Sequence, residues 1–284
     1  MKIDAHQHFW KYDPARDSWI TDHMAILKRD FYPQDLEFEC HASGIDASVV
    51  VQVDQSENET LALLNLAGRS KRIGGVVGWV DLSSPNVQER LQFFSQYNKL
   101  CGFRHIAQSE PDDRFLMQPN FLNGISHLRK FNFTYDILIY PRQLPAAIEL
   151  ASHFPEQFFV VDHLAKPEIK SNNLGSWLTD IRTIAENPNV YCKLSGLVTE
   201  ADWQNWKPED FRPYLDVVFD AFGPERLMFG SDWPVCLLAA SYRQVKQIID
   251  EYLESCEEDC KKLIFGDNAI HFYRLNSLRY GPTA

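Results

Sequence analysis

The sequence lacks any long hydrophobic run. No segment approaches the roughly 18 consecutive apolar residues that a membrane-spanning helix requires. The first residues also lack the basic stretch, apolar segment and small-residue cleavage site of a secretory signal. We therefore expect no membrane partner and no export, and we predict a cytoplasmic protein.

Cysteine is scarce and scattered. The 284 residues contain six cysteines, without the dense spacing of a disulfide framework. This usage is typical of proteins in a reducing compartment. Cys256 and Cys260 have the spacing of one helical turn, and we interpret them as free surface thiols rather than metal ligands.

An excess of positive charge is absent as well. Lysine and arginine number 28 against 39 aspartate and glutamate residues, a formal net charge of -11. Such an acidic chain has no counter-charge for nucleic acid or an anionic membrane, so both are excluded as partners. A small neutral substrate stays compatible with this charge.

Short runs of β-branched and aromatic residues recur along the chain, bounded by turn residues. They predict strands at residues 2–9, 47–54, 73–82, 100–108, 133–141, 157–165, 189–197 and 226–234. Segments with apolar residues at helical spacing separate most of them. Eight strands alternating with helices predict an α/β protein, a single-domain (β/α)8 TIM barrel over residues 1–284. A doubly wound sheet is the alternative, and the missing glycine-rich phosphate loop after the first strand weighs against it.

The longest irregular segment, residues 11–32, follows the first predicted strand. Loops at the carboxyl ends of barrel strands build the active site and its specificity. We therefore expect this segment to contribute to substrate recognition.

Polar residues gather near the predicted carboxyl ends of several strands. His6 and His8 are two residues apart on the first strand and therefore face the same side. Elsewhere two polar residues are adjacent, as in Asp162–His163 and Arg104–His105. Because neighbouring strand residues face opposite sides, we expect only one residue of each pair to point into the barrel.

These motifs together resemble a known family. The stretches DAHQHFW, GFRH, VDHLAKP, KLSGL and FGSDWPV are similar to those of the amidohydrolase superfamily of metal-dependent barrel hydrolases. Within it, they most resemble the amidohydrolase-related lactonase group that contains bacterial L-fuconolactonases and L-rhamnonolactonases. The resemblance extends from residue 2 to the GDNAIHFYRL segment, almost the full chain.

The resemblance implies that His6, His8, His163 and Asp232 form the catalytic quartet. The same four residues are the metal ligands if a metal is bound. The wider superfamily often holds two metal ions, using a histidine on strand five that residues 133–141 do not contain. We therefore expect either one divalent ion, with zinc favoured by the histidine ligands, or a metal-independent enzyme.

The activity implied is hydrolysis of a small sugar lactone of the L-fuconolactone type to its aldonic acid. Asp232 is the expected general base that activates water, and the histidines polarise the carbonyl group. We assign substrate binding to four further residues, Arg104, His105, Trp10 and Trp233.

Two other activities compete with this one. The first is hydrolysis of L-rhamnonolactone or another lactone, and the second is decarboxylation by a related barrel enzyme. A decarboxylase needs several cationic groups for its substrate's carboxylate, whereas Arg104 is the one obvious inward arginine among the predicted strand ends. The sequence leaves the oligomeric state open.

Overall fold

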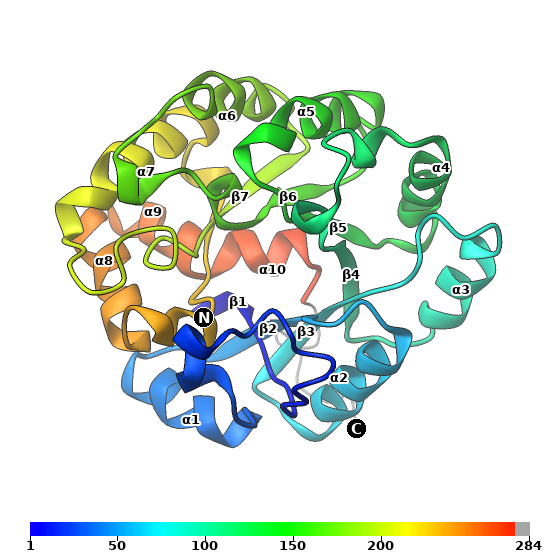
Figure 1. Ribbon diagram of the computed structural model, residues 1–284, viewed down its shortest axis with the longest axis horizontal. Coiled ribbons are helices and arrows are strands. Elements are labelled where there is room, and N and C mark those ends of the chain that lie inside the picture. Colours follow the sequence, from blue (N-terminus) through cyan, green and yellow to red (C-terminus); the bar gives the residue numbers. More distant parts are fainter. Residues whose placement is uncertain (276–284) are drawn as a thin grey trace.

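A computed structural model describes residues 1–275 of the chain, so the last nine residues of the predicted 1–284 domain lie outside the described part. One eight-stranded sheet of parallel strands, in the order β1 to β8, forms the centre (Figure 1). Gln7 and Trp233 make a parallel bridge that brings the first and last strands together. The predicted (β/α)8 barrel is confirmed.

Each predicted strand is present, and each lies within its predicted range. The strands are β1 (Ile3–Gln7), β2 (Ala47–Val51), β3 (Ile73–Gly78), β4 (Leu100–His105), β5 (Thr134–Ile137), β6 (Phe159–Val161), β7 (Val190–Leu194) and β8 (Leu227–Phe229). Almost every strand residue is buried. Burial on both faces explains why these runs are apolar rather than alternating.

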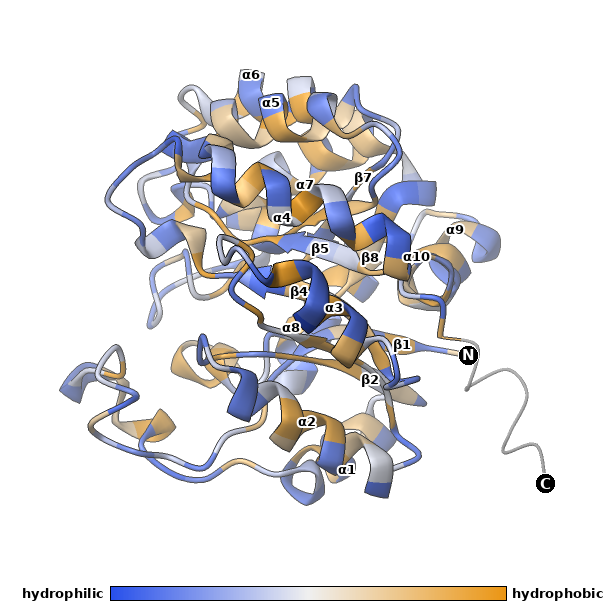
Figure 2. Cartoon of the chain, turned by 90° about the vertical axis from the view of Figure 1, so that its right-hand side faces the viewer, coloured by the Kyte–Doolittle hydropathy of each residue, from blue (hydrophilic) through white to orange (hydrophobic). Residues whose placement is uncertain are grey.

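Helices surround the barrel on its outer side, and the last helix lies across the centre of the ring in this view (Figure 1). They are α1 (Pro33–Ala42), α2 (Glu57–Arg69), α3 (Val87–Phe94), α4 (Pro119–Leu128), α5 (Leu144–His153), α6 (Trp177–Ala185), α7 (Pro208–Phe222), α8 (Tyr242–Tyr252), α9 (Glu258–Lys262) and α10 (Asn268–Phe272). Their apolar sides face the sheet (Figure 2). No helix in the described range is both long and apolar enough to cross a bilayer.

Helix α1 has no counterpart in the sequence prediction. It buries only Leu36 and Cys40, so its apolar periodicity is weak. It begins instead with local signals, because Pro33 occupies the first helical turn and the Asp35 carboxylate accepts a hydrogen bond from the Tyr32 amide at 2.8 Å.

Strand β1 contains an irregularity that matters for the site. Asp4 pairs with Ser48 and Gln7 with Val50, so β1 has one residue more than β2 in this interval. Such a bulge interrupts the alternation of side chains. Ala5 packs into the buried apolar cluster beside α10, while His6 still contacts the polar residues of the barrel centre.

Candidate active site

A cavity of about 520 Å³ opens at the carboxyl ends of the strands, where barrel enzymes place their active sites. It is lined by His8, Trp19, Met24, Val53, Arg104, Ile106, Gln108, Ser109, Leu138, Tyr140, His163, Lys166, Thr199, Glu200, Trp203, Asp232, Val235 and Leu238. Trp19 and Met24 come from the loop at residues 11–32. The cavity wall therefore combines residues at the strand ends, among them His8, His163 and Asp232 of the quartet, with residues of loops.

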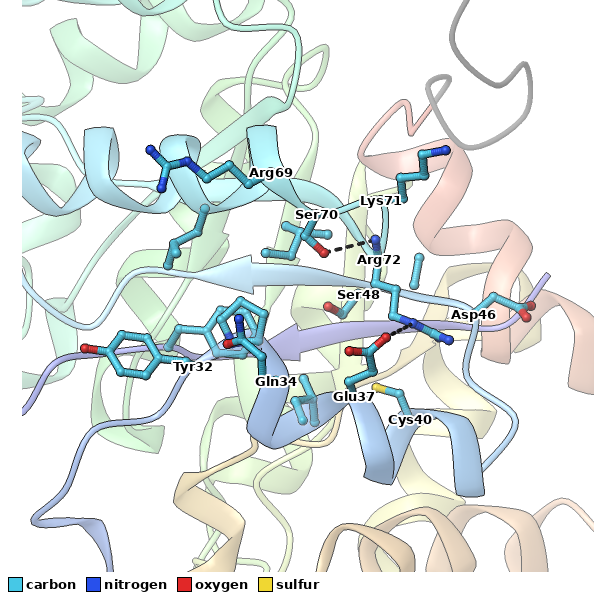
Figure 3. Close-up of a pocket in the computed structure, with 16 residues that line it drawn as sticks. Tyr32, Gln34, Glu37, Cys40, Asp46, Ser48, Arg69, Ser70, Lys71 and Arg72 are labelled. Carbon is cyan, nitrogen blue, oxygen red and sulfur yellow. Dashed lines mark hydrogen bonds and ion pairs between the residues drawn. The ribbon is translucent and has the colours of Figure 1, made fainter.

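A second hollow, of about 640 Å³, lies outside the barrel between α1 and α2 (Figure 3). Its wall includes Arg69, Lys71 and Arg72, and Arg72 Nε lies 3.2 Å from a Glu37 carboxylate oxygen. None of the quartet residues lines it. The barrel cavity is consequently the candidate active site.

The two histidines of β1 are held in defined orientations. His8 Nδ1 lies 2.8 Å from the carbonyl oxygen of Val51, so this nitrogen carries the proton and donates it. The other ring nitrogen, Nε2, is then a free lone pair. It lies 3.2 Å from His6 Nε2 and 3.3 Å from Asp232 Oδ1.

Asp232 reaches the site because its backbone is tied to β1. Its amide donates to the His6 carbonyl at 2.8 Å, and the His8 amide donates to the Trp233 carbonyl at 2.7 Å. Asp232 also has a positive φ of 57°, which turns the chain at the end of β8. These contacts place one carboxylate oxygen 3.8 Å from His6 Nε2 and 3.9 Å from His163 Nε2.

His163 follows β6 in an uncommon backbone conformation. Residues 163–166 all have positive φ values between 52° and 57°. Left-handed conformation at non-glycine residues is strained and clusters at functional sites. Here the turn directs His163 toward Asp232, while its Nδ1 lies 2.8 Å from Ser195 Oγ.

This turn makes one prediction wrong. Asp162 and His163 both face the barrel interior, where Asp162 contacts Arg104 at 2.9 Å and His163 lines the cavity. Opposite facing holds only within a strand, and β6 already ends at Val161. A glycine provides the space, because a Cβ atom at Gly196 would lie 2.7 Å from the His163 ring.

A buried charge network lies beneath the quartet. Lys193 Nζ is 2.6 Å from Asp136 Oδ2, 2.9 Å from Asp162 Oδ1 and 3.1 Å from His6 Nδ1. All four side chains are fully buried. An ammonium group therefore fills the space between these carboxylates and His6, which agrees with the expectation of no more than one metal ion.

Burial and this network set the protonation of the site. Burial lowers the pKa of His163 to about 4, and it lowers the pKa of His6 well below its usual value despite the opposing charge of Asp162. Burial by itself would raise the pKa of Asp232. The neighbouring His163, together with His8 and His6, outweighs this effect and holds the pKa of Asp232 below the usual range. At neutral pH the site thus offers neutral His6 and His163 rings and an ionised Asp232 carboxylate.

His6, His8 and Asp232 have ligand atoms close enough together to hold a metal ion. Ligand atoms 2.0–2.1 Å from a tetrahedral zinc ion are separated by roughly 3.3 Å. The separations from His8 Nε2 to His6 Nε2 and to Asp232 are 3.2 and 3.3 Å, close to this value. The hydrogen bond from His8 Nδ1 to the Val51 carbonyl orients the imidazole ring, so Nε2 is the atom that faces a metal ion.

Of the four predicted substrate-binding residues, only Arg104 lines the cavity. His105 points away from the barrel interior. On that outer side, Glu110 lies 2.7 Å from its Nε2 and Phe115 stacks on its ring. Trp10 and Trp233 are buried against Phe31. The structure therefore does not place His105, Trp10 and Trp233 on the wall of this cavity. Strand parity turns His105 outward, and both tryptophans pack under the long loop.

Sequence reasoning missed four cavity residues as a group: Lys166, Glu200, Trp203 and Gln108. Lysine side chains are usually exposed to solvent, so the sequence assigned Lys166 to the surface. The left-handed turn at residues 163–166 instead brings it to the cavity. Glu200 and Trp203 follow β7 in a segment without helical or strand periodicity. Only the barrel rule that loops after strands line the mouth could have indicated them.

The chain is similar to known proteins over most of its length. An L-fucono-1,5-lactonase from Burkholderia multivorans is 41% identical over 286 residues, covering 97% of this chain and 96% of that protein. An L-rhamnono-gamma-lactonase from Scheffersomyces stipitis is 26% identical and covers 64% of this chain and 61% of its own.

The chain is also similar to solved structures over most of its length. The crystal structure of a Burkholderia multivorans amidohydrolase with bound zinc is 41% identical and has a TM-score of 0.93, covering 96% of this chain and 99% of that one. The amidohydrolase family model matches residues 3–275. With its eight-stranded barrel and its His6, His8, His163 and Asp232 cluster, the chain belongs to the amidohydrolase family.

Proposed function

We propose that this protein hydrolyses L-fucono-1,5-lactone, or a closely similar sugar lactone, to the aldonic acid. The observation that carries the proposal is the position of the Asp232 carboxylate, 3.3 to 3.9 Å from three imidazole nitrogens beside a 520 Å³ cavity. The 41% identical L-fucono-1,5-lactonase, matched over nearly its full length, supports the choice of substrate.

Hydrolysis of a lactone requires a base, a polarised carbonyl group and a proton for the ring oxygen. Asp232 accepts a proton from water as the water oxygen bonds to the carbonyl carbon. The tetrahedral intermediate then collapses, the bond from this carbon to the ring oxygen breaks, and Asp232 returns the proton to the ring oxygen. The resulting carboxylic acid ionises in solution to the aldonate.

His6, His8 and His163 would hold one zinc ion together with Asp232. A bound zinc ion supplies a water of lowered pKa and polarises the carbonyl group. Hydrogen bonds orient two of these rings, because His8 contacts the Val51 carbonyl and His163 contacts the Ser195 hydroxyl. Arg104, fixed by Asp162 at 2.9 Å, presents its guanidinium to the same cavity.

The decarboxylase alternative is not favoured. Arg104 and Lys166 are the cavity-lining cations, and each has a carboxylate partner. Among residues 1–275, a carboxylate substrate would find no uncompensated lysine or arginine on this cavity wall.

Acid release from a panel of aldonolactones tests the activity. We expect hydrolysis of L-fucono-1,5-lactone with a higher kcat/KM than its gamma-lactone isomers or L-rhamnono-gamma-lactone. A pH-indicator assay corrected for spontaneous hydrolysis measures it. Absence of enzymatic hydrolysis of all these lactones, with carbon dioxide released from a dihydroxybenzoate, would contradict the proposal.

Elemental analysis tests the metal site. After incubation with zinc and desalting, we expect about one zinc ion per chain, because Lys193 occupies the neighbouring cation position. His8→Gln should reduce the bound zinc, while His127→Gln, on the outer helix α4, should not. Full activity of chelator-treated, metal-free protein would show instead that the imidazoles act only as hydrogen-bonding groups.

A further inference from the structure

Four charged side chains line the cavity: Arg104, Lys166, Glu200 and Asp232. Arg104 is only 4% exposed, and its guanidinium bonds Asp162 and the carbonyl oxygen of Gln52. It is therefore already committed to protein partners. Lys166 is the second cation, and the environment of its ammonium group decides whether the cavity can hold an anion.

Lys166 is matched by a carboxylate across the cavity wall. Its Nζ lies 3.5 Å from Glu200 Oε1, and the two side chains are 17% and 22% exposed. The same Nζ lies 5.6 Å from the centre of the Tyr140 ring, which also lines the cavity. The left-handed turn after β6 supplies Lys166, and the segment after β7 supplies Glu200, so the pair depends on two separate loops.

Other groups on this wall suit an uncharged polyol. Gln108 Oε1 is buried and accepts no hydrogen bond from any residue between 1 and 275. An acceptor in this state is complementary to a ligand hydroxyl group. Trp19 and Trp203 offer aromatic surface for the apolar C–H face of a sugar ring, and Trp203 is fixed by its indole donating to the Thr199 carbonyl at 2.9 Å.

We propose that the Lys166–Glu200 pair is a specificity determinant that restricts the cavity to uncharged, polyhydroxylated lactones and weakens binding of the anionic product. The inference rests on the proposed lactonase function. Glu200 accepts hydrogen bonds from substrate hydroxyl groups and at the same time neutralises Lys166. The lysine is consequently not free to bind a carboxylate.

The reaction itself makes this charge balance useful. Hydrolysis converts a neutral lactone into an aldonate whose new carboxylate forms beside Asp232. With Arg104 and Lys166 both compensated, no lysine or arginine among the cavity residues that the structure describes is free to attract the new charge. The product carboxylate therefore finds no free ammonium or guanidinium partner on this wall, so we expect the product to dissociate rather than inhibit.

Calorimetric binding of sodium L-fuconate and of its neutral alditol, L-fucitol, tests the role of the pair. Glu200→Gln frees Lys166 inside the cavity, so L-fuconate should bind about tenfold more tightly or better, as a charged hydrogen bond allows. L-Fucitol should gain nothing from this change. In turnover, Glu200→Gln should show stronger product inhibition by L-fuconate at equal metal content.

Matched variants make the test specific. Glu186→Gln removes the same charge from the exposed end of α6 and should leave L-fuconate binding unchanged. Lys166→Met combined with Glu200→Gln should abolish the gain, and Glu200→Ala repeats the test if Glu200→Gln does not fold. If the protein hydrolyses L-fuconolactone but neither Glu200 variant binds L-fuconate more tightly, this inference is overturned. Absence of lactone hydrolysis by the unmodified protein overturns the proposed function instead.

Discussion

Asp232→Asn is expected to lower kcat for lactone hydrolysis by about 10²- to 10⁴-fold, the range over which general acid–base catalysis contributes. Asparagine keeps the shape of the side chain but cannot accept a proton from water at neutral pH. The backbone contacts of residue 232 to His6 do not involve the carboxylate and should persist. Initial rates of acid release at saturating lactone measure the effect.

Circular dichroism and the melting temperature of the Asp232→Asn protein provide the structural control. Asp259→Asn, an exposed change on α9, should retain normal kcat. A folded Asp232→Asn protein with near-normal turnover would show that another group is the base.

Lys193→Met is expected to lower the free energy of unfolding by about 3–5 kcal/mol, the usual cost of removing one partner from a buried ion pair. Lys193 is fully buried, and its ammonium group contacts Asp136 at 2.6 Å and Asp162 at 2.9 Å. Methionine fills a similar volume but leaves Asp136 without its cation and Asp162 with Arg104 as its remaining cation. Urea denaturation followed by tryptophan fluorescence measures the loss.

A double-mutant cycle separates charge from packing. Asp136→Asn in the Lys193→Met background removes the carboxylate that has lost its cation and should restore part of the lost stability. Lys170→Met changes a lysine that is 71% exposed and should have little effect. Equal losses from Lys193→Met with and without Asp136→Asn would show that packing, rather than charge, dominates.

The barrel was predictable because burial on both faces gives most of the strands a short apolar run. Residues 47–51 and 73–78 show such runs, and both were predicted as strands. Helix α1 was missed because it buries only two residues and depends on its cap. Where burial is slight, periodicity carries little information.

The candidate quartet was also predictable, since His6, His8, His163 and Asp232 stand at strand ends in recognisable motifs. The directions in which the side chains point were not predictable. Strand parity assigned His163 and Asp162 to opposite sides, but the positive φ values at residues 163–166 bring both inward. Trp10 and Trp233 have sequence positions near the mouth, yet both rings are buried against Phe31.

The sequence by itself thus determined the eight strands, their order and the residue types available at the barrel mouth, because periodicity and motif spacing are local properties of the chain. Only the tertiary structure decided that Lys193 sits between Asp136 and Asp162, and that Lys166 meets Glu200. These partners come from different strands and loops. Their contacts depend on barrel closure and on a left-handed turn, and neither leaves a periodic pattern in the sequence.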